Sequence, residues 1–259
     1  MKHIRRLFQY RYLLWMWILR EVKIRYKQSI LGGAWAILQP LSLAIIFSVV
    51  FSLFARVPTD GVPYPIFAYA ALLPWTLLAT SVSFAVPSLV NNMNLVTKAS
   101  FPREILPLAV IGAAFVDFCV ASTVFAVMMI IFQVPMRWTL VWVPLLVLIQ
   151  ILLILGVILL GSAINVFFRD VRFVVPLGLQ LWLYATPVIY PISLVPERFR
   201  TLYMLNPMAG LIASYRRVIL QGLPPAPLDL ALATVLSCTL CVLAYWFFKR
   251  VERQFADII

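Results

Sequence analysis

The chain has 259 residues, of which 64% are hydrophobic and 12% are charged. Soluble domains are about 45–50% apolar and about 25% charged, so this composition excludes a soluble globular protein and indicates an integral membrane protein. The formal net charge of +12 does not indicate a nucleic-acid partner, because most Lys and Arg residues fall in segments that the predicted topology places on the inner side of the membrane.

The first predicted element is an amphipathic helix over residues 7–28 that lies in the membrane interface. From Glu21 to Lys27 charged and apolar residues alternate with period two, which by itself indicates a strand. No second alternating segment is present to pair with such a strand, so a helix is favoured. Lys23, Arg25 and Lys27 are expected among lipid headgroups or in the cytosol, because a Lys or Arg at the bilayer centre costs at least about 2.5–3.5 kcal/mol.

Six transmembrane helices are expected to follow, because a span needs about 20 apolar residues and the length leaves no room for a sizeable soluble domain. The chain is therefore predicted to be an all-α membrane protein that forms a single transmembrane domain over residues 1–259. The basic amino terminus and the basic tail place both termini in the cytoplasm. The predicted spans are 31–54, 66–90, 105–132, 138–166, 173–189 and 228–248.

Prolines and glycines within the spans predict how the helices pack. Pro74 and Pro87 each remove a backbone hydrogen bond from the second span and are expected to kink it, which suits a wall that must open. Gly156 and Gly161 in the fourth span are expected to let neighbouring helices approach closely.

Asp117, in the third span, is the carboxylate that lies well inside a predicted membrane segment. Two interpretations remain open: a structural hydrogen bond to a Ser or Asn side chain of a neighbouring helix, which is favoured, and a role in the transport pathway or gate. A single acid with no Lys, Arg or His inside the membrane is poor support for a proton or ion relay, so an ion-driven transporter is disfavoured.

The stretch 194–221 is predicted to form short re-entrant helices at the outer face. It is apolar enough to suggest a seventh span, but Asn206-Pro207 and Arg216-Arg217 interrupt it. A crossing here would also place the basic tail outside, against the positive-inside rule. Two outer gate helices that enter the membrane only partway, hinged at Asn206 and Pro207, fit better.

The chain carries no recognisable catalytic or nucleotide-binding motif. Gly156–Ser162 has glycines at the spacing of a phosphate-binding loop, but Ser stands where the Lys should be. No loop gathers the Asp, Glu or His residues that a metal site or acid–base chemistry needs, which argues against a membrane glycosyltransferase. We therefore expect no catalytic residue, metal or cofactor in this chain, and interpret Cys238 and Cys241 as packing residues.

Aromatic residues make up 14% of the chain, and several lie deep in spans or beside prolines. Aromatic faces offer apolar surfaces over which sugar rings can slide. For any single residue, packing in the core or against lipid is the favoured interpretation, and lining of a channel is the alternative. The candidates for the lining are Tyr69, Trp75, Phe84, Asp117, Trp182, Tyr184 and Tyr190.

Several short motifs occur along nearly the whole chain in the order seen in one family. They are Arg20–Gly32 with Trp35 and Gln39-Pro40, Phe101–Pro107, Phe168–Arg172, Pro187–Pro191 and Leu205–Pro207. In this ordered combination, the chain resembles the permease subunits of type-2 ABC exporters. It is most similar to those that export O-antigen, teichoic acid or related polysaccharides.

The resemblance implies a homodimer of six-helix subunits around a central channel in the bacterial inner membrane. It also implies two separate ATPase subunits, which bind ATP and Mg²⁺, so that the permease itself is not an enzyme. The expected function is export of a lipid-linked polysaccharide of the O-antigen type. The alternatives are a type-2 exporter of a drug, lipid or other small molecule and, less favoured, a dedicated capsule or teichoic acid exporter or an ion-driven transporter.

The resemblance also implies roles for residues at matching positions. The substrate entrance on the interface helix comprises Arg20, Lys23, Arg25, Tyr26 and Lys27. The coupling segment that contacts the ATPase comprises Val96, Thr97, Lys98, Ser100, Phe101 and Pro102. A second contact with the ATPase comprises Arg169, Asp170 and Arg172.

Overall fold

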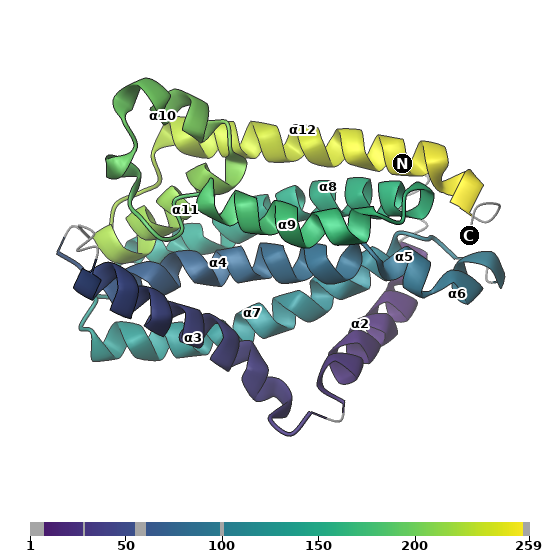
Figure 1. Ribbon diagram of the computed structural model, residues 1–259, viewed down its shortest axis with the longest axis horizontal. Helices are drawn as coiled ribbons and strands as arrows, with labels where there is room; N and C mark the ends of the chain where they lie inside the picture. Colours follow the sequence, from purple (N-terminus) through teal and green to yellow (C-terminus); the bar gives the residue numbers. More distant parts are fainter. Residues whose placement is uncertain (1–7, 28, 55–60, 99–100, 256–259) are drawn as a thin grey trace.

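The computed structural model describes residues 8–27, 29–54, 61–98 and 101–255, and these residues contain helices and connecting segments but no strand (Figure 1). The α-helices are α2 (Arg11–Tyr26), α3 (Trp35–Ser48), α4 (Tyr64–Ala85), α5 (Ser88–Asn91), α6 (Met93–Lys98), α7 (Ile105–Ile131), α8 (Val143–Phe167), α9 (Val171–Tyr184), α10 (Glu197–Met204), α11 (Pro207–Arg216) and α12 (Pro227–Val251). The shorter elements are the 3-10 turns η1 (Gly32–Ala34), η3 (Trp138–Trp142), η4 (Ile192–Leu194) and η6 (Glu252–Gln254) and the π-helical turns η2 (Val49–Phe54) and η5 (Arg217–Gln221).

Among the residues that the structure describes, five helical segments are long and apolar enough to cross a membrane, which indicates a multi-pass, all-α membrane protein. They correspond to the first, second, third, fourth and sixth predicted spans. Their bounds are Gly32–Phe51, Tyr64–Ala85, Ile105–Ile131, Trp138–Phe167 and Pro227–Gln254.

The fifth predicted span, 173–189, is wrong at its carboxyl end. Helix α9 has 14 residues and ends at Tyr184, and the following residues as far as Pro191 form turns and coil. Pro187 explains the early end, because a proline disfavours helical backbone at the residue before it. At 1.5 Å per residue α9 is about 21 Å long, too short to cross about 30 Å of hydrocarbon on its own.

The second predicted span, 66–90, is also interrupted. Helix α4 ends at Ala85, and the short helix α5 begins after Pro87, because a proline inside a helix removes a hydrogen bond and clashes with the preceding turn. Pro74, by contrast, lies inside continuous α4. The carbonyl of Pro74 accepts a hydrogen bond of 2.6 Å from Gln150 of α8.

Helix α4 is the centre of the molecule, in contact with α3, α7, α8, α9 and α11. Its central position explains why most of its side chains are buried. On one side of it, α8 and α12 pack along each other (Figure 1). At Gly156 of α8, an added Cβ would lie 2.9 Å from the backbone nitrogen of Cys241, so the predicted close approach at this glycine is confirmed.

The predicted amino-terminal helix is present as α2, and the choice of helix over strand for residues 21–26 is confirmed, while its place in the membrane interface stays a prediction. Its predicted ends, residue 7 and Gln28, lie outside the described residues. Helix α2 packs on the first half of α7, with Ile18 against Gly112. Below, the end of the bundle that carries α6 is called the inner end, and the opposite end, with α10 and η5, the outer end (Figure 1).

The 194–221 stretch contains two short helices, α10 and α11, joined at Leu205 and Asn206. They differ in their surroundings. Helix α11 is largely buried and contacts α4, α8 and α12, whereas α10 is mostly exposed and stands away from the bundle (Figure 1). Of these two helices, α10 is therefore the more loosely attached, through contacts with α11 and α12.

Candidate functional site

The side chains predicted to form a substrate entrance gather where α2 packs on α7. Arg25 forms an ion pair with Asp117 of α7, and the hydroxyl of Tyr26 donates a hydrogen bond of 2.5 Å to the same carboxylate. The ring of Phe84, from α4, lies 4.9 Å from the Arg25 guanidinium. The predicted Ser or Asn partner of Asp117 is therefore wrong, because the interface helix supplies an Arg and a Tyr instead.

A cavity of about 180 Å³ lies beside this ion pair, between α2, α3, α4 and α7. Burial raises the pKa of the Tyr26 phenol, so Tyr26 stays protonated and donates to Asp117 at neutral pH. A wall that combines aromatic faces with hydrogen-bonding groups is suited to polar molecules that also carry apolar surface, such as sugars. The wall includes Arg25, Tyr26, Trp35, Gln39, Thr80, Phe84 and Asp117.

The other basic residues of α2 are exposed. Arg20 lies 4.3 Å above the ring of Trp17 and 3.4 Å from the Glu21 carboxylate, and such exposed ion pairs contribute little to stability. Lys23 and Lys27 are exposed. Arg25 thus differs from its neighbours, because it points into the protein and they do not.

The predicted coupling residues lie at the inner end, on α6 and the segment that follows it (Figure 1). Val96 is buried, whereas Thr97 and Lys98 are exposed. Phe101 is half-buried and Pro102 is buried. Ser100 lies outside the described residues.

The second predicted contact is the exposed turn between α8 and α9. Arg169, Asp170 and Arg172 are all exposed there, and the turn lies at the same end of the molecule as α6 (Figure 1). The structure therefore brings both predicted contact segments to one end, with their polar side chains open to a partner.

An ion-pair network that the sequence did not predict fixes the coupling segment to the end of α12. Arg103 donates hydrogen bonds from its backbone nitrogen to the Glu252 carboxylate (3.3 Å) and from its guanidinium to the Glu252 carbonyl. Lys249 lies 2.7 Å from the buried carboxylate of Glu104 and 2.8 Å from that of Glu252. Another guanidinium nitrogen of Arg103 reaches the Val96 carbonyl at 3.4 Å, so the network extends into α6.

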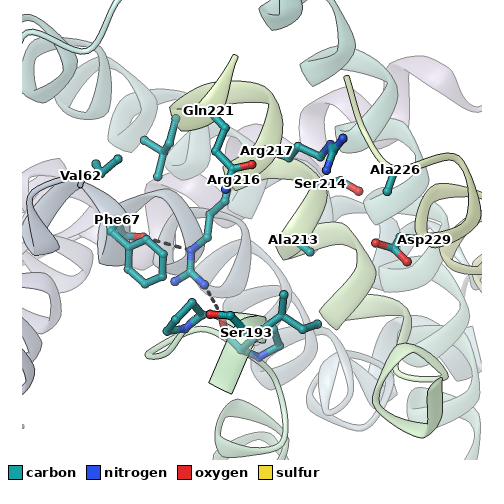
Figure 2. Close-up of a pocket in the computed structure, with 14 residues that line it drawn as sticks. Val62, Phe67, Ser193, Ala213, Ser214, Arg216, Arg217, Gln221, Ala226 and Asp229 are labelled. Atoms are coloured by element: carbon teal, nitrogen blue, oxygen red, sulfur yellow. Dashed lines mark hydrogen bonds between the residues drawn. The ribbon is translucent and has the colours of Figure 1, made fainter. Parts of the chain in front are cut away.

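At the outer end, Arg216 is a buried cation surrounded by backbone carbonyls (Figure 2). It donates to the carbonyls of Phe67, Pro187, Val188 and Tyr190, and its guanidinium lies 3.6 Å from the centre of the Phe67 ring. Burial lowers the pKa of Arg216 to about 9, which leaves it charged at neutral pH. This side chain fixes the coil after α9 to the start of α4.

Asn206 and Pro207, the predicted hinge, lie between α10 and α11. The Asn206 amide donates to the Ala185 carbonyl and the Thr186 hydroxyl, while its oxygen accepts from Trp182 (2.9 Å) and from the backbone nitrogen of Met208. The last of these bonds caps the first turn of α11. Bending at this residue must therefore break contacts with α9.

Comparison with known proteins identifies the family. Residues 12–220 match the family model described as the ABC-2 type transporter. The chain belongs to the ABC-2 transporter membrane family. An ABC-2 permease of this kind works in the membrane together with a separate ATPase, and the predicted resemblance is confirmed.

Two curated relatives match this ABC-2 permease over almost its whole length, and a third matches about four fifths of it. It is 35% identical to the O-antigen export system permease protein RfbA of Myxococcus xanthus over 260 residues. This alignment covers 99% of this chain and 98% of the relative. It is 30% identical to a protein of the same name from Klebsiella pneumoniae, over 93% of this chain and 92% of the relative. It is 21% identical to the polysialic acid transport protein KpsM of Escherichia coli, over 79% and 80% of the two chains.

The candidate lining residues of the ABC-2 permease fall into buried and accessible groups. Tyr69 and Trp75 are buried: Tyr69 stacks on Phe125, and Trp75 meets Trp182 edge to face. For these two residues core packing, the favoured interpretation, agrees with the structure. Phe84 and Tyr184 are 54% and 58% exposed, and Tyr190 and Trp182 are partly exposed, so these four have surface that a second subunit or a substrate can contact.

Within the described residues of the ABC-2 permease, no three or more His, Cys, Asp or Glu side chains gather closely enough to hold a metal ion. Sequence reasoning did not single out five charged residues that the structure shows to be paired or buried: Arg103, Glu104, Lys249, Glu252 and Arg216. The sequence did offer one signal, because charged residues are rare in this chain and a buried charge requires a partner.

Proposed function

We propose that this chain is the membrane-spanning subunit of an ATP-driven exporter of an O-antigen-type, lipid-linked polysaccharide. The observation that carries the proposal is the similarity over almost the whole chain to two relatives named as O-antigen export permeases. In this proposal the chain acts in the bacterial inner membrane as a homodimer with both termini cytoplasmic. Two ATPase subunits bind ATP and Mg²⁺ and supply the energy.

The inner end is where force from the ATPase enters the permease. The exposed side chains of α6 and of the turn at Arg169–Arg172 form the contact, as the family resemblance implies. Arg103 and Glu252 then carry movement of α6 to α12, because their hydrogen bonds join the two elements. Helix α12 packs along α8, and α8 contacts α4. Movement of α12 can therefore be passed through α8 to α4, the central helix of the bundle.

The cavity between α2, α3, α4 and α7 is the proposed entrance for the glycan. Its wall offers the Phe84 and Trp35 rings and the polar groups of Gln39 and Thr80, a combination that suits sugar rings. The Arg25–Asp117 ion pair holds α2 against α7 at this cavity. Displacement of α2 requires this pair to separate, so the pair gives the entrance a closed state.

A homodimer is supported by the apolar faces that one chain leaves uncovered. Along α9 the exposed side chains include Phe173, Val174, Leu177, Leu181 and Tyr184. A single short helix of this kind cannot enclose a channel for a polymer. A second copy placed against α9 supplies the other half of the wall and adds the Tyr184 side chains of both subunits to it.

A type-2 exporter of a drug, lipid or other small molecule is the second candidate, because it shares the architecture. The relative named for polysialic acid transport, at 21% identity, supports polysaccharide as the general substrate class. The higher identity of the two O-antigen permeases favours O-antigen over capsule.

The test is deletion of the gene in the source bacterium, with complementation by the wild-type chain. We expect loss of polymeric O-antigen from the cell surface, accumulation of lipid-linked glycan inside, and recovery of both on complementation. Immunoblots of intact and lysed cells measure the two pools. Normal surface O-antigen in the deletion strain, together with loss of export of another compound, would contradict the proposal and favour the second candidate.

A further inference from the structure

A cavity of about 190 Å³ lies at the outer end, away from the proposed entrance (Figure 2). Its walls come from the beginning of α4, the coil after α9, the α11–η5 segment and the beginning of α12. A volume of this size holds several water molecules. This is room for one sugar ring or a similarly small polar group, and not for a folded chain.

Three polar side chains on one side of this cavity have hydrogen-bonding groups that the described residues leave unused (Figure 2). The Ser214 hydroxyl is buried and has no hydrogen-bond partner. Arg217 donates from Nε to the Pro224 carbonyl at 2.6 Å, and its terminal nitrogens make no hydrogen bond within the described part of the chain. A buried polar group without a partner is costly, so the Ser214 hydroxyl points to a ligand that completes it, and the partly buried Arg217 lies on the same cavity wall.

The third side chain is Asp229, at the beginning of α12. It lines the same cavity as Arg217, but among the described residues the two form no ion pair within 4.0 Å. A carboxylate acceptor and a guanidinium donor that face one cavity without pairing match adjacent hydroxyl groups, since the carboxylate accepts from one hydroxyl and the guanidinium donates to the next. Ser193 and Gln221 add neutral polar groups to the wall.

The charge of the cavity favours a neutral ligand. The carbonyls of Phe67, Pro187, Val188 and Tyr190 already surround the Arg216 guanidinium. The remaining charges, on Arg217 and Asp229, are opposite in sign, so the formal charge of +1 on the lining as a whole comes from Arg216, whose donors are already bound. An anion would face the Asp229 carboxylate, and a cation would face Arg217, so a neutral polyhydroxyl group fits better than either.

We infer that this cavity binds one sugar residue of the exported polysaccharide through adjacent hydroxyls, held by Ser214, Arg217 and Asp229. The inference rests on the proposed function and deepens it, because it adds a sugar site at the outer end to the entrance at α2. A zwitterionic lipid headgroup, with its phosphate on Arg217 and its ammonium on Asp229, is the competing ligand. The neutral groups of Ser193, Ser214 and Gln221 favour the sugar.

The experiment uses the complete complex with its ATPase in nanodiscs that contain phosphatidylglycerol and no phosphatidylethanolamine. The probe is the O-antigen polysaccharide of the source strain, released from lipopolysaccharide by mild acid, and calorimetry measures its Kd. We expect Asp229→Asn to raise Kd about tenfold and Ser214→Ala to raise it a few-fold, in line with the loss of hydrogen bonds to a charged and a neutral group. Glu197→Gln, an exposed acid on α10 outside this cavity, is the matched control and should leave Kd unchanged.

Two outcomes would overturn the inference: no binding of the polysaccharide by the wild-type complex, or equal Kd for wild type and both variants. If Asp229→Asn does not fold, Ser214→Ala is used for the test. Ser214→Ala removes a hydroxyl that has no hydrogen-bond partner in the described residues, so it should not disturb folding. Surface display in the complemented deletion strain tests the proposed function separately. Normal display by wild type with unchanged Kd in the variants would reject the sugar site alone.

Discussion

Arg103 and Glu252 are 149 residues apart in the sequence, yet two hydrogen bonds join them at the inner end of the molecule. Arg103 follows α6, the predicted coupling helix, and Glu252 lies directly after the end of α12. Lys249 and Glu104 complete the network with ion pairs of 2.7 and 2.8 Å. The coupling segment is therefore attached to a long helix and does not end in a free loop.

Glu252→Ala should uncouple ATP hydrolysis from transport. The change removes the acceptor for the Arg103 backbone and one of the two carboxylates around Lys249, so movement of α6 no longer reaches α12 in full. We expect export to fall about tenfold at near-normal ATPase activity, as loss of a coupling free energy of about 1–3 kcal/mol predicts. Assays of transport and of ATPase activity in proteoliposomes measure the amount of glycan exported per ATP hydrolysed.

The matched control is Arg253→Gln, which changes an exposed charge on the adjacent residue. This variant should export as much glycan per ATP hydrolysed as the wild type. If Glu252→Ala and Arg253→Gln behave alike, the network has no part in coupling.

Asp117→Asn should weaken the attachment of α2 to α7. The ion pair is largely shielded from solvent, with 15% and 17% of the two side chains exposed. Removal of one charge leaves Arg25 without a carboxylate partner, at a cost of about 1–3 kcal/mol. A disulfide between cysteines introduced at Ile18 and Gly112 should form more slowly in this variant than in the wild type, while Lys23→Gln should have no effect.

An exchange of charges separates the ion pair from other roles of Asp117. The double variant Arg25→Asp with Asp117→Arg restores the attraction and should recover most of the crosslinking rate and of the transport. Failure of the double variant to transport, at a normal crosslinking rate, would instead indicate a direct role of Asp117 in the pathway.

Hydropathy alone predicted the long spans well, because each depends on the composition of its own segment. The error in the fifth span has a local cause that hydropathy ignores: the residues from Ala185 to Tyr190 are as apolar as a span, but Pro187 and the carbonyls bound by Arg216 hold them as coil. The pairing of Arg25 with Asp117 is not visible in any local pattern, because it joins residues 92 positions apart. Long-range contacts of this kind require the packing of α2 on α7 to be known first.

Arg216→Gln should destabilise the whole subunit. The glutamine side chain is too short and has too few donors to serve the four carbonyls that Arg216 binds, and unsatisfied buried carbonyls cost about 1–3 kcal/mol each. A loss of about 3 kcal/mol corresponds to a decrease in Tm of roughly 6–12 °C for a chain of this size. Thermal unfolding of the purified protein in detergent measures it.

Arg198→Gln, an exposed arginine on α10, is the control for this prediction and should change Tm by less than about 2 °C, as a surface substitution does. An equal decrease in both variants would show that the effect comes from net charge and not from the carbonyl contacts.

Gly156→Ala and Gly178→Ala should change stability in opposite directions. The new Cβ at position 156 would lie 2.8 Å from the Leu240 side chain and 2.9 Å from the Cys241 backbone, so α8 and α12 must move apart at a cost of about 1–3 kcal/mol. At Gly178, in α9, no atom lies within 4 Å, and alanine gains up to about 1 kcal/mol of helix propensity. Thermal unfolding measures the stability of both variants, and an unchanged or higher Tm of Gly156→Ala would contradict the close helix contact.

The shortness of α9 has a consequence for the surrounding lipid. A helix of about 21 Å leaves nearly a third of a 30 Å hydrocarbon layer to be matched by coil or by bent lipid chains. Mismatch of this kind costs a fraction of a kcal/mol per Å, and thinner membranes reduce it. The length of the lipid acyl chains therefore affects the free energy of hydrophobic mismatch around α9. Vesicles made from shorter lipids should reduce this mismatch without any change in sequence.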